Sequence, residues 1–370
     1  MNHQIIENAP FREYFQVHIL LWRAVERKVK GLRYSFSNAD TIRHFSYSVS
    51  DNHYHTLRQL NRQLNEFPGL VVTNDGLELE ACRKFGTRSV LFSIVHDFYN
   101  LRLAIESQDL VDYFICHTEV FTRALLSSHS LKGRVEFLLH GVRIPETPAP
   151  TGTKAHERLK IISISRLTES KGVLLLAGID EQLLQRGVHV DWVIIGSGEL
   201  EEELKAQWAG KGSIQFYNPD GPEGVIAIAR DCDIFISPSH FEGYGIALLE
   251  AMSCGLVPVI HRLPVGVYSD LPEDTGFSVE IGDAAGFADR IERLHRDRAL
   301  LAAMGRRARL LVAEKYDITK TAGLFLQHFA THGSPQINKD SRPKQNQEFG
   351  VLDRPYIPNS LARFVRKFRS

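Results

Sequence analysis

One stretch in the second half of the chain combines a buried strand, a loop with two glycines and a helix. Residues 234–236 form a short apolar run that ends at a Ser-Pro pair, where proline removes a donor from the ladder of a sheet. Gly243 and Gly245 flank a tyrosine in the loop and permit close approach of a ligand or a positive φ. Apolar residues at helical spacing follow over 246–252, and a second apolar run comes next. This order indicates a strand–helix–strand unit of a parallel α/β sheet.

The start of the predicted helix lies between two carboxylates. Glu242 precedes the helix, and Glu250 lies inside it eight positions later. The backbone N–H groups of Tyr244, Gly245 and Ile246 lie at the helix N-terminus, where N–H groups lack intrahelical partners and negative charge is stabilised. A diphosphate held there would have acceptors for sugar hydroxyls on either side. The spacing therefore favours a nucleotide-sugar site over a junction with two solvated glutamates.

The segment resembles the E-x7-E motif of retaining, nucleotide-sugar-dependent glycosyltransferases of family 4 (glycosyl transferases group 1), and the likeness covers roughly residues 155–330. The resemblance implies the GT-B fold, an α/β architecture of two facing Rossmann-like domains, each with a doubly wound parallel sheet. It implies that Glu242 holds hydroxyls of the transferred sugar and that Glu250 binds the ribose of the donor. No cofactor is expected, because the nucleotide-sugar, UDP- or GDP-linked, is a substrate.

Two basic residues, Arg166 and Lys171, follow the first strand of the second half, which covers residues 160–165. The family has an Arg and a Lys at this spacing, and both contact the donor diphosphate. Cleavage of the bond between sugar and nucleotide leaves extra negative charge on the phosphate, which fixed cations stabilise most in the transition state. The alternative is a solvated loop with an ordinary ion pair to Glu169. Their position at a strand end favours the diphosphate role.

His96 and Asp97 end a continuous apolar strand predicted over residues 89–95. Ligands of open α/β sheets gather at the carboxyl ends of the strands, so this pair is a second site candidate. In the family, a histidine after this strand commonly reaches the transferred sugar, and His96 matches that position. An equally supported alternative is that His96 only ends the strand and Asp97 caps the next helix.

Two further patterns argue against a metal site and against dinucleotide binding. Residues 231–233 form a D-x-D, the metal-binding pattern of the other glycosyltransferase fold, but they precede their strand and predict a helix-to-strand turn without metal. Residues 196–199 contain a G-x-G after a strand, without the third glycine of a dinucleotide fingerprint. We interpret this segment as a structural turn, and an NAD-dependent dehydrogenase is disfavoured.

Composition narrows the class of protein. The 370 residues suffice for two domains, and 44 basic residues balance 44 acidic ones, so no overall field attracts nucleic acid. The four cysteines are scattered without C-x-x-C spacing, which fits a reducing compartment. Neither a signal peptide nor an apolar run of about 18 residues is present. These features predict a cytoplasmic protein.

The chain is predicted to contain two domains and a tail. Residues 1–148 form an N-terminal, acceptor-side domain, and a Pro/Thr-rich linker over 145–153 ends it. Residues 155–331 form the nucleotide-sugar-binding domain, and residues 332–370 form a polar, basic tail that is loosely ordered up to residue 360. At the N-terminus we expect a short strand over 3–7, then a helix from Phe11 that extends to Val29. Residues 8–12 stand where the family has a glycine-rich first loop, so we expect either a first loop without contact to the donor phosphate or an abbreviated domain.

The tail ends in a predicted amphipathic helix with two faces. The apolar face contains Leu361, Phe364, Val365 and Phe368, and the basic face contains Arg363, Arg366, Lys367 and Arg369. Such a helix is typical of peripheral contact with an anionic membrane surface, here the inner face of the membrane. The equally supported alternative is that the apolar face docks on the first domain while the arginines are solvated.

These observations predict a retaining, metal-independent glycosyltransferase. It would move a hexosyl unit from a UDP- or GDP-sugar to a saccharide or lipid-linked acceptor, in polysaccharide or glycolipid assembly. The alternatives are a catalytically silent GT-B domain that binds glycan or a partner enzyme, and an epimerase or phosphorylase of the same fold. Retention of Glu242, Arg166 and Lys171 favours the enzyme.

Overall fold

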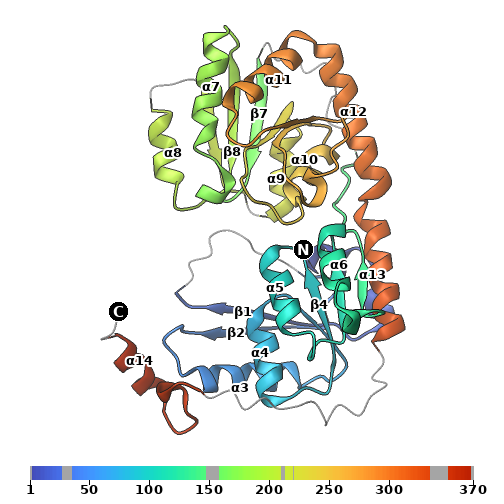
Figure 1. Cartoon of the computed structure of the whole chain (residues 1–370), viewed down its shortest axis with the longest axis vertical. Helices are drawn as coiled ribbons and strands as arrows, with labels where there is room; N and C mark the ends of the chain where they lie inside the picture. Colours follow the sequence, from blue (N-terminus) through green and yellow to red (C-terminus); the bar gives the residue numbers. More distant parts are fainter. Residues whose placement is uncertain are drawn as a thin grey trace. The chain divides into compact units, whose positions relative to one another are not determined.

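The computed structural model describes residues 2–26, 36–146, 158–209, 213–219, 221–333 and 349–367 (Figure 1). Contacts within the chain divide it into two units, which we describe separately. The first unit comprises residues 1–30, 35–139 and 322–370, and the second comprises residues 31–34 and 140–321. The division thus falls between residues 139 and 140, and residues 147–153 of the linker predicted over 145–153 lie outside the described residues.

The second unit contains a six-stranded parallel sheet in the order β12-β11-β10-β7-β8-β9. Its strands are β7 (Leu159–Ile164), β8 (Val190–Ile195), β9 (Ser213–Tyr217), β10 (Ile234–Ser237), β11 (Val257–His261) and β12 (Phe277–Val279). Its helices are α7 (Leu175–Gln185), α8 (Glu201–Gln207), α9 (Gly221–Ala229), α10 (Ile246–Ser253), α11 (Ala284–Arg296) and α12 (Arg298–Lys315). The predicted alternation of strand and helix is confirmed, and β12 adds an edge strand that sequence analysis misses.

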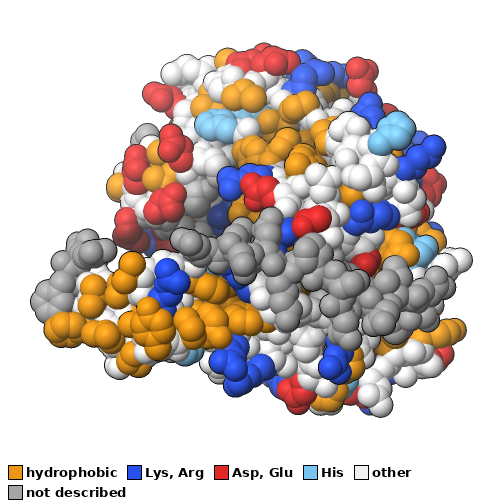
Figure 2. Space-filling model, turned by 60° about the horizontal axis from the view of Figure 1, so that its bottom comes forward, with side chains coloured by type: hydrophobic (Ala, Val, Ile, Leu, Met, Phe, Trp, Pro, Cys, Tyr) orange, Lys and Arg blue, Asp and Glu red, His pale blue; other side chains and the backbone are white. Residues whose placement is uncertain are grey.

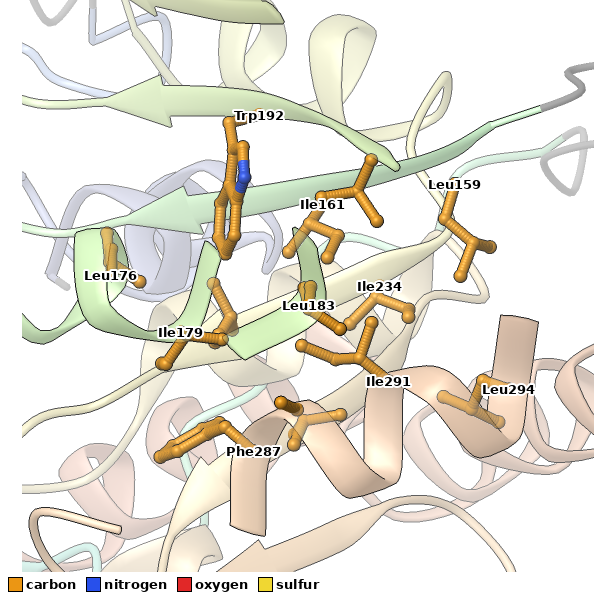
Figure 3. Packing of buried hydrophobic residues seen from close by; sticks show 14 of the residues in the cluster. Leu159, Ile161, Leu176, Ile179, Leu183, Trp192, Ile234, Phe287, Ile291 and Leu294 are labelled. Carbon is orange, nitrogen blue, oxygen red and sulfur yellow. The ribbon is translucent and has the colours of Figure 1, made fainter. Parts of the chain in front are cut away.

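Both faces of this sheet are buried. Successive residues of a strand point to opposite faces. Ile161 and Trp192 accordingly belong to one hydrophobic cluster, whereas Ile162 and Val193 belong to another. Helices α7 and α11 pack on the first face (Figure 3), and α10 packs on the second. Burial on both sides explains why β7, β8, β10 and β11 are nearly continuous apolar runs in the sequence.

The direction of strand addition reverses between β7 and β10. From β7 the chain adds β8 and β9 on one side, and it then returns to place β10, β11 and β12 on the other side. The loops that follow β7 and β10 therefore leave neighbouring strands at the switch point of the sheet, where open α/β sheets bind ligands. Lys171 lies in the first of these loops, and Glu242 lies in the second.

The first unit contains a four-stranded parallel sheet, β3-β4-β5-β6, and a separate parallel pair, β1-β2. The strands are β1 (His18–Ala24), β2 (Thr41–Tyr47), β3 (Leu70–Thr73), β4 (Val90–Val95), β5 (Tyr113–Cys116) and β6 (Val135–Phe137). The helices are α1 (Asn2–Glu7), α2 (Phe11–Tyr14), α3 (His53–Leu64), α4 (Gly76–Phe85), α5 (Phe98–Glu106), α6 (Glu119–Leu126), α14 (Asn359–Lys367) and the second half of α13 (Ile318–His332). None of the described helices is both long and apolar enough to cross a bilayer.

The second half of α13 groups with the first unit, although the sequence places residues 155–331 in one domain. Phe329 of α13 packs edge-on against Phe92 of β4, with ring centroids 5.1 Å apart. Phe11 also contacts Phe329, at a centroid distance of 6.2 Å. Aromatic burial on β4 therefore determines where this part of the helix belongs.

The predictions for the first 30 residues are wrong in two places. Residues 3–7, expected as a strand, lie in helix α1, and the expected helix from Phe11 contains α2 and then β1. Strand β1 pairs with β2 along its whole length, and most of its residues are half-buried. Because both faces gain some cover, β1 lacks the alternation that distinguishes a strand from a helix in sequence. Residues 27–29 of the expected helix lie outside the described residues.

The C-terminal segment is more ordered than predicted. Residues 334–348 lie outside the described residues, but residues 349–367 lie against the start of α3. Asn52, which caps α3, donates a hydrogen bond from Nδ2 to the carbonyl oxygen of Arg354 at 2.8 Å. The predicted terminal helix is present as α14, and its expected residues Phe368 and Arg369 lie outside the described part.

Candidate active site

Backbone contacts hold the loops after β7 and β10 together. The N–H groups of His240 and Phe241 donate to the carbonyl oxygen of Ser170 at 3.0 and 3.2 Å. Gly172 adopts a φ of +61°, and a Cβ there would lie 2.0 Å from the carbonyl oxygen of Pro238. Only glycine fits at this close approach, so the distance between the two loops is set by backbone rather than by flexible side chains.

The loop after β8 packs equally closely on the loop after β7. Gly196 has a φ of +140°, and a Cβ there would lie 1.8 Å from the carbonyl oxygen of Ser165. A Cβ on Gly198 would lie 2.2 Å from the carbonyl oxygen of Leu167. The G-x-G segment is therefore a structural turn that supports the β7 loop, as the sequence predicts.

An ion pair between Lys171 and Glu242 lies at the centre of the candidate site. Lys171 Nζ is 2.7 Å from Glu242 Oε1, and the two side chains are only 14% and 15% exposed. Lys171 Nζ also donates to the carbonyl oxygen of Phe241 at 3.3 Å. No hydrogen bond from the described residues reaches Glu242 Oε2, so this oxygen can accept from a ligand hydroxyl.

A chain of hydrogen-bonded hydroxyl groups holds the Glu242 carboxylate in position. Ser239 Oγ donates to Glu242 Oε1 at 2.8 Å, and Ser237 Oγ lies 3.1 Å from Ser239 Oγ. Tyr268 donates its hydroxyl proton to Ser237 Oγ at 2.9 Å. Each hydroxyl has a single proton, so the donation runs from Tyr268 through both serines to the carboxylate. Burial raises the pKa of Tyr268, and the negative charge of Glu242 adds to the effect, so the phenol stays protonated.

His261 fixes the position of Ser239. Its Nδ1 lies 3.1 Å from the carbonyl oxygen of Ser239, and its Nε2 accepts a hydrogen bond from the N–H of Gly282 at 3.0 Å. These partners assign the proton to Nδ1, and burial lowers the pKa of His261. Sequence reasoning missed Ser237, Ser239, Tyr268 and His261. Only the two serines carry a local signal, because they flank the proline at the end of β10.

Helix α10 begins without a capping side chain. Its N-cap is Gly245, with a φ of 104°, and the part of the chain that the structure describes provides no side-chain cap hydrogen bond. Tyr244 contributes only its backbone, because its buried side chain donates to the carbonyl oxygen of His140 at 2.8 Å. Glu250 is half-buried one turn after Ile246. The first N–H groups of α10 can therefore bind an anion with Glu242 on one side and Glu250 on the other.

Arg166 and Lys171 have different surroundings. Arg166 is exposed, and no ion pair or hydrogen bond connects its guanidinium to any residue that the structure describes. Lys171 is largely buried and pairs with Glu242. The described contacts include no ion pair between Glu169 and either of these two cations. Arg166 is thus the cation at this strand end that can turn to an incoming ligand.

His96 belongs to the first unit, whereas the other predicted site residues belong to the second. Its Nε2 lies 3.9 Å from Asp97 Oδ2, and its buried Nδ1 has no hydrogen-bond partner among the described residues. Burial lowers the pKa of His96, which favours the neutral ring. Asp97 caps α5 by accepting from the N–H of Asn100 at 2.8 Å, as the structural alternative predicts for Asp97.

The D-x-D segment forms the expected turn before β10. Asp233 accepts a hydrogen bond from the N–H of Lys160 at 2.9 Å, and Asp231 forms an ion pair with the side chain of Lys160. Both acids thus hold the amino ends of β7 and β10 together, at the opposite edge from Glu242. Across the described residues, no three His, Cys, Asp or Glu side chains are grouped so that they could hold a metal ion.

Comparison with known proteins identifies the second unit. Residues 149–311 match the family described as "Glycosyl transferases group 1". This part of the chain, which includes Arg166, Lys171, Glu242 and Glu250, is therefore a glycosyl transferases group 1 domain. The chain is also 30% identical over 187 residues to the putative colanic acid biosynthesis glycosyltransferase WcaL of Escherichia coli. That match covers 48% of this chain and 43% of the relative, so the chain spans less than half of the length of WcaL.

Solved structures identify the fold of both units as GT-B. HepE of Anabaena in complex with UDP and glucose has a TM-score of 0.67 at 16% identity, over 85% of this chain and 100% of that chain. Sucrose-phosphate synthase from Thermosynechococcus elongatus has a TM-score of 0.67 at 18% identity, over 89% of this chain and 92% of that chain. The fold class predicted from the sequence, two parallel-sheet α/β domains of GT-B type, is confirmed.

Proposed function

We propose that this chain is a retaining, metal-independent glycosyltransferase that moves a hexosyl unit from a UDP- or GDP-sugar to a saccharide or lipid-linked acceptor. The observation that carries the proposal is the largely buried Lys171–Glu242 pair at the switch point of a glycosyl transferases group 1 domain. An uncapped helix N-terminus lies directly after Glu242. A catalytically silent domain has no need to keep two largely buried charges with Glu242 Oε2 available to a ligand.

In this proposal the donor diphosphate binds the N–H groups of Gly245 and Ile246 and the guanidinium of Arg166. Lys171 has three N–H donors, and its described contacts with Glu242 and Phe241 leave one for a phosphate oxygen. Glu250 accepts hydrogen bonds from the ribose hydroxyls. These groups would together stabilise the charge that develops on the departing diphosphate, which replaces the role of a metal ion.

Glu242 and His96 are assigned to the transferred sugar. Glu242 Oε2 accepts from a sugar hydroxyl, and Lys171 with the Tyr268–Ser237–Ser239 chain holds the carboxylate still. The neutral His96 ring offers its Nε2 for a further hydrogen bond, because its Nδ1 is buried. Held in this way, the sugar carbon presents the same face to the departing and the arriving oxygen.

The chemical step is a substitution with retention. The bond between the anomeric carbon and the phosphate oxygen breaks, and its electron pair leaves on the diphosphate. The acceptor hydroxyl oxygen then bonds to the same face of the anomeric carbon through a short-lived ion pair. Its proton passes to the departing phosphate oxygen, so no protein base is required.

Polysaccharide or glycolipid assembly is the proposed context. The named relative WcaL is described as a colanic acid biosynthesis protein, and HepE is a fold neighbour with bound UDP and glucose. UDP-glucose is therefore the first donor to test. Purified protein should release UDP from it, with and without EDTA, and NMR of the product should show the anomeric configuration of the donor. A requirement for metal, or an inverted product, would contradict the proposed mechanism.

The Arg166→Ala variant should bind nucleoside diphosphate more weakly. Loss of one charge-assisted hydrogen bond to the diphosphate costs about 1.5–3 kcal/mol, which is roughly a 10- to 100-fold rise in the Kd for UDP. Isothermal titration calorimetry measures this change. Arg262→Ala is a matched control, because Arg262 is an exposed arginine that pairs with Glu280. Equal affinity of wild type and Arg166→Ala for UDP would remove Arg166 from the site.

The terminal helix α14 is attached by its basic face. Arg366 donates to both carboxylate oxygens of Asp353 at 2.8 Å, and Arg363 pairs with Asp51. Phe364 is 61% exposed and Leu361 is 44% exposed. The helix therefore docks on the first unit, as the docking alternative predicts, but through Arg363 and Arg366 rather than through its apolar face. In Figure 2 hydrophobic side chains gather at the side of the view where α14 lies, next to Lys and Arg side chains.

We propose on this basis that α14 makes peripheral contact with an anionic membrane surface, at its inner face. Val351 and Tyr356, which precede the helix in the chain, are also exposed apolar side chains, at 80% and 77%. Phe364→Asp should reduce co-sedimentation with phosphatidylglycerol-containing vesicles several-fold, because it places a negative charge in the apolar face. Leu324→Asp, at another exposed leucine, is the control. Unchanged sedimentation of Phe364→Asp would rule out this contact.

A further inference from the structure

A groove of about 850 Å³ lies in the first unit, between the β1-β2 pair and helices α4 and α5. Three aromatic side chains line it: Trp22, Tyr47 and Tyr99. Along α4, its lining extends from Gly76 to Arg83, which is roughly 10 Å at 1.5 Å per residue. The groove is therefore an elongated feature with aromatic walls, and none of its lining residues belongs to the donor site proposed above.

Two of the three aromatic rings of the groove, Trp22 and Tyr99, are held in place by carboxyl groups. Trp22 Nε1 donates to Glu78 Oε1 at 2.9 Å, and Glu78 is a buried side chain whose Oε2 has no hydrogen-bond partner among the described residues. The hydroxyl of Tyr99 donates to Asp75 Oδ1 at 3.1 Å. Rings fixed by their polar ends expose faces that lose little conformational entropy when a ligand stacks on them.

The charge of the groove selects against anions. Asp75, Glu80, Glu106 and Asp109 line it, and Arg83 is the one basic side chain among the described residues of the lining. Arg83 already forms an ion pair, since its Nη1 lies 2.6 Å from Asp109 Oδ2. Glu106 pairs with Arg102 at 2.8 Å, and Glu80 Oε2 lies 2.9 Å from His53 Nε2, so Asp75 is the lining carboxylate without an ion pair among the described residues. A phosphate, sulfate or uronate group beside Asp75 would meet uncompensated negative charge, whereas hydroxyl groups would find acceptors there.

We propose that this groove binds a neutral oligosaccharide, as the part of the acceptor that precedes the reacting sugar. Apolar faces of pyranose rings pack on Trp22, Tyr47 and Tyr99, and ring hydroxyls donate to Asp75 and Glu80. The Asp75 end lies just after β3, the neighbour of β4 in the sheet, and His96 follows β4. A saccharide in the groove would thus lead toward the edge of the sheet that carries His96. The assignment rests on the proposed glycosyltransferase function.

The tryptophans of the chain make a direct test available. The protein has three, and Trp192 and Trp208 are 1% and 3% exposed within the second unit. Trp22 is half-buried and lines the groove, so its emission reports on ligands there. Full-length protein is titrated with maltotriose, cellotriose and laminaritriose, and with a trigalacturonate as the anionic probe. At least one neutral trisaccharide should change the fluorescence saturably and bind more tightly than trigalacturonate.

Two variants test whether the saccharide binds in the groove itself. Tyr99→Ala should weaken binding of the neutral trisaccharide about tenfold, because it removes one stacking face and the ring bonded to Asp75. Tyr14→Ala, at a tyrosine that is 63% exposed and outside the groove, should bind as wild type does. Acceptor-independent hydrolysis of UDP-glucose should be equal in all three proteins. This measurement distinguishes loss of saccharide binding in the groove from loss of donor binding. The proposal is overturned if no neutral trisaccharide gives a saturable signal, if Tyr99→Ala binds like wild type, or if trigalacturonate binds best.

Discussion

Replacement of Glu242 by glutamine is expected to lower kcat for sugar transfer by about 100- to 1000-fold, the range seen when one preorganised electrostatic group is lost. The amide keeps the size of the side chain but removes the charge that binds Lys171 at 2.7 Å. Lys171 is then a nearly buried cation without its carboxylate, and the sugar hydroxyl loses an ionic acceptor. The Kd for UDP should change by less than about threefold, because UDP has no transferred sugar.

Glu250→Ala provides the contrast, since Glu250 is assigned to the ribose. It should weaken UDP binding as well as transfer, whereas Glu242→Gln should impair transfer alone. Glu169→Gln, an exposed glutamate in the loop after β7, is the control for a surface change near the site. Steady-state kinetics with UDP-glucose and calorimetry with UDP separate the two effects. An equal loss of UDP affinity in Glu242→Gln and Glu250→Ala would contradict the assignment of sugar and ribose sides.

The second large effect concerns stability and comes from Glu78. Burial raises the pKa of Glu78 to about 7 from an ordinary value of 4.5. Between these two values the folded protein binds the proton and the unfolded chain does not, so stability falls as pH rises through this window. At 1.36 kcal/mol per pKa unit, the loss between pH 4.5 and pH 7 is about 3 kcal/mol, and it persists at higher pH.

Glu78→Gln should remove this pH dependence. A glutamine side-chain oxygen can still accept from Trp22 Nε1, so the variant should be more stable than wild type at pH 8 and similar at pH 4.5. Urea unfolding of the first unit can be followed through Trp22, since the other two tryptophans belong to the second unit. Glu119→Gln, at a glutamate that is 74% exposed on α6, should leave the pH profile unchanged. Parallel pH profiles for wild type and Glu78→Gln would show that Glu78 stays ionised in the folded protein.

Local chemistry explains why the β10–α10 segment could be predicted from the sequence. A proline ends the strand, glycines form the loop, and apolar spacing marks the helix, and each of these signals acts over a few residues. Strands buried on both faces, such as β8 and β10, are apolar at almost every position and are equally evident. The resemblance to a known family then assigns roles to Glu242 and Glu250 that the residues alone only suggest.

Contacts between distant loops could not be predicted in this way. The Lys171–Glu242 pair forms because β10 is placed beside β7, and this strand order is set by the packing of helices on both faces of the sheet. The supporting hydroxyl of Tyr268 follows β11 and reaches Ser237 at the end of β10. Hydrophobic periodicity indicates which residues are buried, but not which strands become neighbours.

The N-terminal part also shows that sequence patterns do not determine which strands pair. β1 has a continuous apolar run with helix-like spacing, and only its pairing with β2 makes it a strand. That pairing places Trp22 over Glu78 of α4 and beside Tyr47 of β2, which creates the aromatic wall of the groove. The sequence by itself therefore identifies the fold class and the residues around α10, because those depend on short-range patterns. Tertiary structure alone determines the Lys171–Glu242 pair, the hydroxyl chain and the groove, because each joins segments that are far apart in the chain.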